Sequence, residues 1–249
     1  MYYLNYESDS PYLNLALEEV LLEPYIKNSD AKLLFRSWYN QQKTVVIGRG
    51  EKINEQVHLS NTEKDSIPII RRVSGGGTVL HGPDNLNLSF FLPFYHHHEL
   101  KNLKSSYQVI LSWVQSALRN SHQISSEING SCDLVMNGKK ISGTAQARKR
   151  HGLLHHMTLL LKADYEGMQK YLREPNKRPK YRNKRTHKDF VIGLKDAYPN
   201  FNLTYFLNEL RAIIKAKETI ALTPAQLSKA RELCVKYRSQ QWNHEGRFS

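Results

Sequence analysis

Cysteine and long apolar runs are both scarce in this sequence, and each scarcity excludes a class of protein. The sequence has only two cysteines, Cys132 and Cys234, a number that argues against a disulfide scaffold and fits a reducing compartment. Their spacing does not match that of a metal site. No apolar stretch approaches the roughly 20 residues of a membrane span, and no signal-peptide pattern opens the chain. We therefore expect a cytoplasmic protein that neither crosses a membrane nor contains a cysteine-based metal site.

Acidic residues are outnumbered, with 23 Asp and Glu against 36 Lys and Arg, for a net charge of +13. The segment Asn176–Lys188 contains no acidic residue and seven basic ones: Lys177, Arg178, Lys180, Arg182, Lys184, Arg185 and Lys188. Because like charges repel, we expect this segment to be a mobile loop until an anion or a partner neutralises it. A basic surface attracts a polyanion, an acidic protein or an acidic ligand, and composition leaves all three open.

The hydrophobic pattern mixes strands and helices in what we expect to be a single domain over residues 1–249. Ser10 followed by Pro11 is typical of a helix start, and apolar residues then recur at helical spacing. Strand-like runs are Leu33–Trp38, Thr44–Ile47, Ile67–Arg72, Leu86–Leu92 and Leu153–Leu161; further helices are expected at Leu103–Leu118, Tyr205–Ile214 and Pro224–Tyr237. Several strand links are too short for parallel crossovers, which predicts an α+β fold around a largely antiparallel or mixed sheet.

A glycine-rich motif, Arg71-Arg72-Val73-Ser74-Gly75-Gly76-Gly77-Thr78-Val79, follows one of these strands. Three glycines let the backbone turn sharply, and their N–H groups are able to cradle an anion that the arginines neutralise. The pattern is neither a Walker P-loop nor a dinucleotide-binding fingerprint. Taken alone, it is explained equally well by a flexible loop.

A tight hairpin is predicted around Asn137-Gly138, which joins Asp133–Met136 to Lys139–Ser142. Strand alternation would place Lys140 and Ser142 on one face and Ile141 on the other. A lysine held on such a hairpin is able to neutralise a phosphate or polarise a carbonyl, although an ordinary solvated lysine is the plainer interpretation.

Two adjacent histidines, His155 and His156, stand inside an apolar strand-like run. Neighbouring side chains of a strand point to opposite faces, so one histidine is expected on the site or core side and the other on the opposite side. A packed, hydrogen-bonded histidine is the plainer interpretation of either.

Together, the order and spacing of these features resemble the lipoate–protein ligase A family, within the wider biotin and lipoate ligase group. The matching stretches are Arg71–Gly77, His81, Asn85-Leu86-Asn87, Asp133-Leu134, Lys140–Ala145 and His155–Leu160. Asn14, Ala16, Glu18, Val46–Arg49 and Trp242-Asn243 also look like the family. The resemblance covers nearly the whole chain and implies the class II synthetase-like catalytic domain of biotin and lipoyl ligases.

The resemblance also implies a role for individual residues. Lys140 looks like the family's essential lysine, which contacts the carboxylate and the phosphate of the forming acyl-adenylate. The other positions carried over to ATP and lipoyl-adenylate binding are Arg72, Ser74, Gly75, Gly76, Gly77, Thr78, Val79, Leu80, His81, Asn85, Asp133, Gly143, Thr144 and Ala145. Cations and N–H donors are required there because a carboxylate attacks a phosphate, and the two anions repel.

The implied reaction uses ATP and Mg²⁺, with lipoate or octanoate as the substrate. The implied acceptors are apo lipoyl domains of 2-oxoacid dehydrogenases and the glycine-cleavage carrier protein. Many members carry an accessory domain after the catalytic domain, whereas this chain ends soon after Trp242. We therefore expect a catalytic domain without that accessory domain, with a separate accessory protein as a candidate partner in adenylation.

Two rival functions remain. Cys132 directly precedes Asp133, and related octanoyltransferases use a cysteine as acyl acceptor without ATP, so Cys132 is a candidate nucleophile; a small packed residue is the plainer interpretation. The basic segment is also compatible with a nucleic-acid-binding protein. Little aromatic interleaving beyond Tyr181 and the lack of a helix-turn-helix pattern disfavour that class.

Overall fold

The computed structural model describes residues 1–27, 31–130, 132–174 and 179–247. An eight-stranded sheet in the order β11-β1-β2-β6-β10-β9-β8-β7 forms its centre. Its strands are β1 (Tyr2–Asn5), β2 (Leu34–Trp38), β6 (Asn85–Pro93), β7 (Glu127–Asn129), β8 (Asp133–Met136), β9 (Lys139–Arg148), β10 (Gly152–Leu160) and β11 (Glu218–Ile220). Strands β11, β1 and β2, at one end of the sheet, run parallel to one another, and the other neighbouring pairs are antiparallel, which confirms the predicted mixed sheet.

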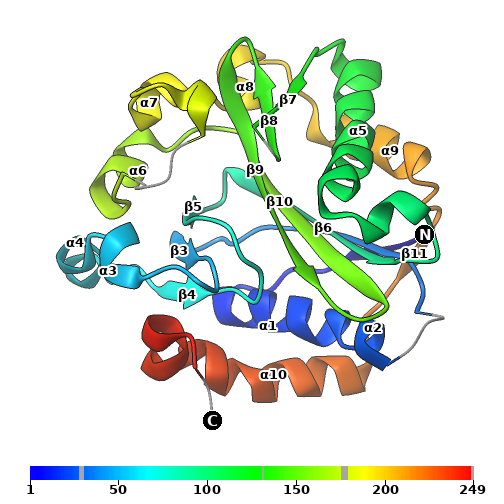
Figure 1. Ribbon diagram of the computed structural model, residues 1–249, viewed down its shortest axis with the longest axis horizontal. Coiled ribbons are helices and arrows are strands. Elements are labelled where there is room, and N and C mark those ends of the chain that lie inside the picture. Colours follow the sequence, from blue (N-terminus) through cyan, green and yellow to red (C-terminus); the bar gives the residue numbers. More distant parts are fainter. Residues whose placement is uncertain (28–30, 131, 175–178, 248–249) are drawn as a thin grey trace.

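A second, three-stranded sheet lies beside the first, in the order β4-β3-β5 (Figure 1). Its strands are β3 (Thr44–Ile47), β4 (Ile69–Arg71) and β5 (Val79–His81). The glycine-rich motif connects β4 to β5, so both ends of that motif are held by the same small sheet. This arrangement places the glycines where the two sheets face each other.

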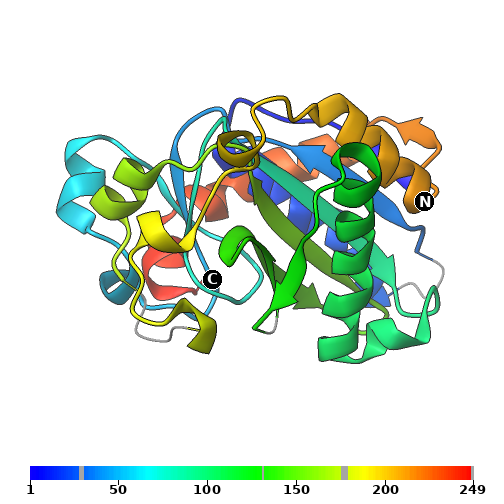
Figure 2. The same ribbon diagram turned by 90° about the horizontal axis from the view of Figure 1, so that it is seen from above.

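Helices cover both faces of the large sheet (Figures 1 and 2). On one face α5 (Leu103–His122) and α9 (Leu203–Ile213) pack together over the main apolar core; on the other, α1 (Pro11–Leu22) is covered by α10 (Pro224–Arg238). The shorter helices are α2 (Pro24–Lys27), α3 (Ile53–Gln56), α4 (Leu59–Lys64), α6 (Tyr165–Tyr171), α7 (His187–Phe190) and α8 (Leu194–Ala197). In the described part of the chain no helix is both long enough and apolar enough to cross a membrane.

Two local predictions are confirmed by backbone detail. Ser10 caps α1, because its side chain accepts a hydrogen bond from the backbone N–H of Leu13, and Pro11 occupies the first helical turn. The Asn137-Gly138 turn has φ of 51° and 72°, the left-handed values that a tight hairpin turn between β8 and β9 requires.

One prediction about this hairpin is wrong. The register shifts between Leu134 and Val135, so that Leu134 faces Ser142 while Val135 faces Lys140. Leu134 and Val135 are adjacent in β8, so their side chains point to opposite faces of the sheet. Each shares a face with its partner across β9, and Lys140 and Ser142 therefore lie on opposite faces. Ser142 is fully buried opposite two core leucines, Leu134 and Leu159, and Lys140 alone faces the cavities described below.

The expectation of a disordered basic segment is also wrong for residues 180–188. Lys180–Arg182 forms a 3₁₀ turn and α7 begins at His187. The buried Arg182 donates to the Glu174 carboxylate at 2.6 Å, and Arg185 donates to the carbonyl of Gly138. Arg182 is thus paired with an acid outside the segment, and Arg185 is held by a backbone carbonyl. Lys177 and Arg178 lie outside the described residues.

Candidate active site

Two cavities meet at Lys140 in the space between the two sheets and α7. The first, of about 200 Å³, reaches towards α1 and β2; the second, of about 270 Å³, reaches towards α6 and α7. Residues that line both are Gly77, Thr78, Val79, Asp133, Lys140, Gly143 and Thr158. Lys140 therefore stands at the junction, in reach of a ligand in either cavity.

The strand register builds part of the wall of the first cavity from two rows of side chains. Trp38, Asn87, Thr158 and Gly143 are direct partners across β2, β6, β10 and β9. The next row on the same face contains Arg36, Ser89, His156 and Ala145. Because every second residue of a strand shares a face, these polar groups converge although they come from four separate segments.

The glycine loop is held against β3 by a close approach of two backbones. A Cβ atom at Gly48 would lie 1.8 Å from the carbonyl oxygen of Gly76, and Gly76 has a φ of +83°. No other residue type fits at Gly48 without moving the loop, and Gly76 adopts a conformation that glycine allows without strain. The loop position therefore depends on these two glycines.

Arg72 lies beneath this loop with its guanidinium buried. It donates to the carbonyls of Gly75 at 2.6 Å and Gly77 at 2.8 Å, and to Ser74 Oγ at 2.9 Å. Burial, opposed only in part by Glu18, lowers the pKa of Arg72 to about 10, which leaves the group charged at neutral pH. The positively charged guanidinium of Arg72 thus holds the glycine loop in a curved conformation around it, at the edge of the first cavity.

A buried carboxylate completes this arrangement from α1. Ser74 Oγ lies 2.6 Å from His156 Nε2, and His156 Nδ1 lies 2.8 Å from Glu18 Oε2. Burial raises the pKa of Glu18, but His156, Ser89 and Arg36 outweigh it and hold the pKa below its ordinary value. Glu18 is therefore ionised and links α1 through His156 and Ser74 to the glycine loop.

At the junction, Lys140 Nζ forms an ion pair with Asp133 Oδ1 at 2.8 Å. The second oxygen of Asp133 accepts a hydrogen bond from the Tyr181 hydroxyl at 2.6 Å, and burial followed by the Asp133 charge raises the pKa of Tyr181. A Cβ atom at Gly143 would lie 3.2 Å from Lys140 Nζ, so the missing side chain leaves room for the ammonium group. The basic segment is thereby tied to the hairpin that carries Lys140.

Most residues predicted for the site are brought together. Those lining the first cavity are Arg72, Gly76, Gly77, Thr78, Val79, His81, Cys132, Asp133, Lys140, Gly143, Thr144 and Ala145; Leu80 lines the second. Ser74 lies just behind this lining, and Gly75 contributes its carbonyl to Arg72. Asn85, at the start of β6, lines neither cavity.

Several lining residues were missed. In the first cavity they are Leu15, Trp38, Val46, Asn87, Met157 and Thr158; in the second they are Gln56, Leu160, Met168, Leu172, Arg173, Pro179, Arg182, His187, Phe190 and Val191. A signal existed for some of them, because Asn85, Asn87 and Ser89 alternate with apolar residues in a fully buried strand. Buried polar residues at every second position indicate a polar site on one face of a sheet.

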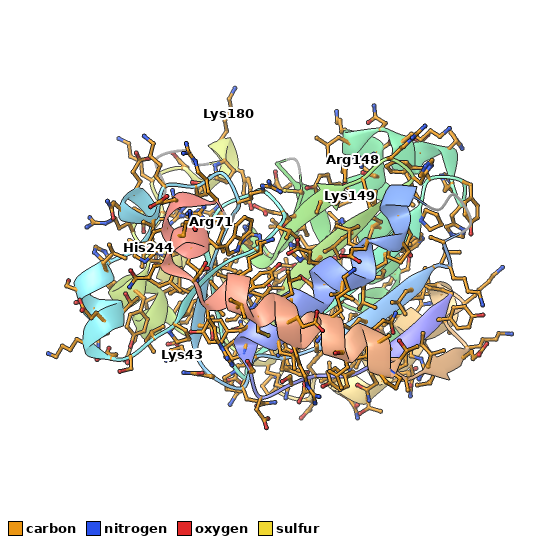
Figure 3. All side chains as sticks on the ribbon, turned by 90° about the horizontal axis from the view of Figure 1, so that it is seen from below. Lys43, Arg71, Arg148, Lys149, Lys180 and His244 are labelled. Carbon is orange, nitrogen blue, oxygen red and sulfur yellow. The ribbon has the colours of Figure 1, made fainter. Side chains whose placement is uncertain are left out.

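Arg71, the neighbour of Arg72, serves a different purpose. Its guanidinium donates to the carbonyls of Gly48, Arg49, Glu51, Asn243 and His244. Figure 3 shows Arg71 beside His244 at the C-terminal turn (Gln241–Glu245). Arg71 therefore fastens this turn to the loop after β3 and is not among the residues that line the two cavities.

The chain matches a known protein family. The family model of the lipoyl protein ligase A/B catalytic domain matches residues 10–215. A protein of Mycoplasma genitalium named "Probable lipoate-protein ligase A" is 32% identical over 238 residues, which cover 94% of this chain and 69% of that protein.

Two solved structures share the fold. A bipartite lipoate protein ligase of Thermoplasma acidophilum, described with its E2 lipoyl domain, superimposes with a TM-score of 0.84 at 23% identity, covering 100% of this chain and 97% of that one. A lipoate-protein ligase A bound with ATP gives 0.82 at 23% identity, covering 98% of both chains. By its sequence match and its fold, this chain belongs to the family of lipoyl protein ligase A/B catalytic domains.

Proposed function

We propose that this protein is a lipoate–protein ligase, which activates lipoate or octanoate with ATP and transfers the acyl group to a lysine of a lipoyl domain. Family membership supports the reaction class, and the names of the relatives supply its substrates. The observation that carries the proposal is the position of Lys140 at the junction of two cavities of different character.

The first cavity suits an acyl chain whose carboxylate lies near Lys140. Leu15, Trp38, Val46 and Val79 give it apolar walls, and its buried polar groups are mostly paired with one another. The second cavity suits a nucleotide. Arg173, Arg182 and His187 supply positive or donor groups there, beside the Phe190 ring. The Thr78 hydroxyl lines both cavities and has no hydrogen-bond partner among the described residues.

In the proposed first step, the substrate carboxylate attacks the α-phosphorus of ATP, the acyl–phosphate bond forms and pyrophosphate leaves. Both reactants are anions, so the Lys140 ammonium between them offsets their repulsion, and the N–H groups of the glycine loop add donors. In the second step, the acceptor lysine attacks the acyl carbon as a neutral amine. AMP leaves with the bonding electron pair, and the amine loses a proton to the solvent.

Mg²⁺ is proposed as the ion that accompanies ATP. Asp133 is the only carboxylate that lines either cavity in the described part of the chain, and no cluster of three potential ligands occurs among the described residues. A single carboxylate fits Mg²⁺, which is commonly held by one or two carboxylates together with substrate phosphates. When bound, the ion would neutralise phosphate charge, while Lys140 and Tyr181 hold Asp133 in place.

The proposed acceptors are apo lipoyl domains, in 2-oxoacid dehydrogenases and in the glycine-cleavage carrier protein. The bipartite relative from Thermoplasma acidophilum motivates a further proposal, that a separate accessory protein assists adenylation. A cytoplasmic location is proposed because the two cysteines fit a reducing compartment.

A transferase that uses Cys132 is the second candidate. Cys132 lines the first cavity together with Lys140, so an acyl group in that cavity would lie close to this residue. In that reaction the thiolate would displace an acyl carrier and form a thioester without ATP.

One experiment separates these functions. The purified chain is incubated with lipoate, Mg²⁺ and an apo lipoyl domain, with and without ATP, and the acceptor mass is recorded. The ligase proposal expects an ATP-dependent increase by one lipoyl group. Pyrophosphate release and transfer from synthetic lipoyl-adenylate, measured on the same preparation, show whether adenylation needs an accessory protein. Lack of acylation from both ATP-plus-lipoate and lipoyl-adenylate would contradict the proposal.

A further inference from the structure

Asn87 carries an amide donor that no described group satisfies. The residue is 2% exposed, lines the first cavity and lies between Trp38 and Thr158 in one row of the sheet. Its Oδ1 accepts from the Thr158 hydroxyl at 2.9 Å, but its Nδ2 has no hydrogen-bond partner among the described residues. Buried donors are rarely left unpaired, so this amide is a candidate for contact with a ligand.

The orientation of this amide follows from a chain of hydrogen bonds that begins at Arg36. A guanidinium only donates, and Arg36 Nη2 contacts Asn14 Oδ1 at 2.8 Å. The backbone N–H of Ser8 contacts the same oxygen. Asn14 must therefore present its Nδ2 as the donor to the Asn40 side-chain oxygen, at 3.0 Å.

Each later group in the chain is constrained by the one before it. Asn40 Nδ2 donates to His81 Nδ1 at 3.2 Å, so Nδ1 carries a lone pair. Burial, with the nearby charge of Arg72, lowers the pKa of His81 to about 3, so the neutral ring holds its hydrogen on Nε2. That N–H donates to Thr158 Oγ1 at 3.1 Å, and the Thr158 hydroxyl hydrogen is left for Asn87 Oδ1. Asn87 Nδ2 is therefore the donor that is left without a partner at the end of this chain of hydrogen bonds, in a residue that lines the first cavity.

The sheet register gives the distance of Asn87 from the reacting end of the cavity. Asn87 pairs with Thr158, and Thr158 pairs with Gly143 beside Lys140. Two strand spacings separate Asn87 from Gly143, which is about 10 Å. An acid whose carboxylate lies at Lys140 would reach Asn87 with the far part of its chain, against the apolar wall of Trp38.

We propose that Asn87 is a specificity-determining residue that donates a hydrogen bond to an acceptor atom in the distal part of the acyl substrate. The inference rests on the proposed function and narrows its substrate class to acids whose tails carry sulfur or another acceptor. A dithiolane sulfur is a weak acceptor, whereas the methylene groups of octanoate are not acceptors and would leave Nδ2 unpaired. Lipoate is thus favoured over octanoate by this one contact.

The test compares Asn87→Leu, which keeps the branched shape of the side chain and removes the donor, with the wild type. KM is measured by ATP–pyrophosphate exchange for lipoate, for octanoate and for an ether analogue of octanoate with one distal methylene replaced by oxygen. In the variant, the preference for lipoate and for the ether over octanoate should fall by about three- to tenfold, the range of one modest hydrogen bond. The KM for octanoate should stay the same or decrease.

If KM rises equally for all three acids, Asn87 has a structural role. If the KM values and their ratios stay as in the wild type, the ligand does not use the donor. Either result overturns the proposal. Thr158→Val provides an independent test if the first variant does not fold, because it removes the hydroxyl that orients the Asn87 amide. The preference of this variant for lipoate over octanoate should also fall. A Thr158→Val protein with the preference of the wild type would contradict the orientation inferred for the Asn87 amide. If the wild type neither activates any of the three acids nor transfers the lipoyl group from synthetic lipoyl-adenylate, the proposed function fails instead.

Discussion

The two cavities that meet at Lys140 are built by different means. The first lies against four neighbouring strands of the large sheet, and its polar groups form buried chains that end at Glu18 and Arg36. The second is closed by α6, α7 and the turn at Lys180–Arg182, held by an ion pair to Glu174. Buried networks on strands preorganise a site, whereas an ion pair whose carboxylate is partly exposed, as in Glu174, stabilises less.

The walls of the first cavity come from sheet register and from glycine contacts, which do not depend on the basic segment. The second depends on how that segment docks on the hairpin, through Tyr181 and Arg185. We therefore expect substitutions near the first cavity to affect stability or acyl specificity, and substitutions near the second to affect nucleotide use.

The largest effect is expected where the cavities meet. Lys140→Ala should lower acyl transfer by about 10²- to 10³-fold, the usual consequence of removing one preorganised charge contact. Mass spectrometry of the acceptor measures the rate, and thermal unfolding checks the fold. Lys139→Ala is the matched control, because Lys139 precedes Lys140 on the same strand and lines neither cavity. Near-normal turnover by folded Lys140→Ala would contradict the role proposed for Lys140.

Removal of the anchor of the first cavity should cost stability. Glu18→Ala leaves Arg36 and His156 without their buried carboxylate and should lower the free energy of unfolding by about 3 kcal/mol or more. Urea unfolding measures the change. Substitution of the partly exposed Glu23 by Ala, just after the same helix, should change it by less than about 1 kcal/mol. A Glu18→Ala protein as stable as the wild type would show that the first cavity does not depend on this anchor.

The pH dependence of stability provides a third test, at the core face of the large sheet. Burial lowers the pKa of His155 to about 3 from an ordinary 6.5. Below pH 6.5 the unfolded chain binds a proton at this residue that the folded chain does not, so stability decreases as pH falls towards 3. His155→Gln should flatten this decrease by about 1.4 kcal/mol per pH unit. Denaturant titrations at pH 6.5, 5.5 and 4.5 measure it, and an unchanged slope would show that His155 does not stay neutral.

A smaller effect is expected at the second cavity. Tyr181→Phe removes the hydroxyl that holds Asp133, and KM for ATP should rise by about tenfold, which corresponds to ~1.4 kcal/mol. Lipoate binding in the absence of ATP should be unchanged. Lys180→Ala is the control, because Lys180 belongs to the same turn but points into solvent (Figure 3). Equal loss of lipoate and ATP binding in Tyr181→Phe would show that the cavities are not independent.

The smallest effect is expected at Cys132. Cys132→Ser should retain most activity if the protein is a ligase, because Thr144 contacts the Cys132 backbone carbonyl and the ligase reaction needs no thiol there. Intact-protein mass spectrometry of the wild type after incubation with an octanoylated carrier tests the rival. An octanoyl adduct on Cys132, together with loss of activity in the serine variant, would favour the transferase.

The sequence predicted the parts of the site that depend on neighbours along the chain. The Asn137-Gly138 turn, the Ser10 cap and the glycine motif were recognised because each is defined within a few residues. The resemblance then placed Lys140, Arg72 and Asp133 in one site, and the structure brings them together. The short strands β1, β5, β7 and β11 were missed, because three- or four-residue strands carry too little pattern to identify.

Tertiary structure alone decided which face each strand residue occupies and which charges are neutralised. The bulge beside Lys140 sends Ser142 to the core, against the simple alternation, and Glu174 and Gly138 order a segment whose charges predicted disorder. The chain from Arg36 to Asn87 joins residues from α1, β2, β5, β6 and β10, so no local pattern contains it. Short-range propensities determine turns and caps, whereas the register between strands, set by packing of the whole core, determines which polar groups meet in the cavity.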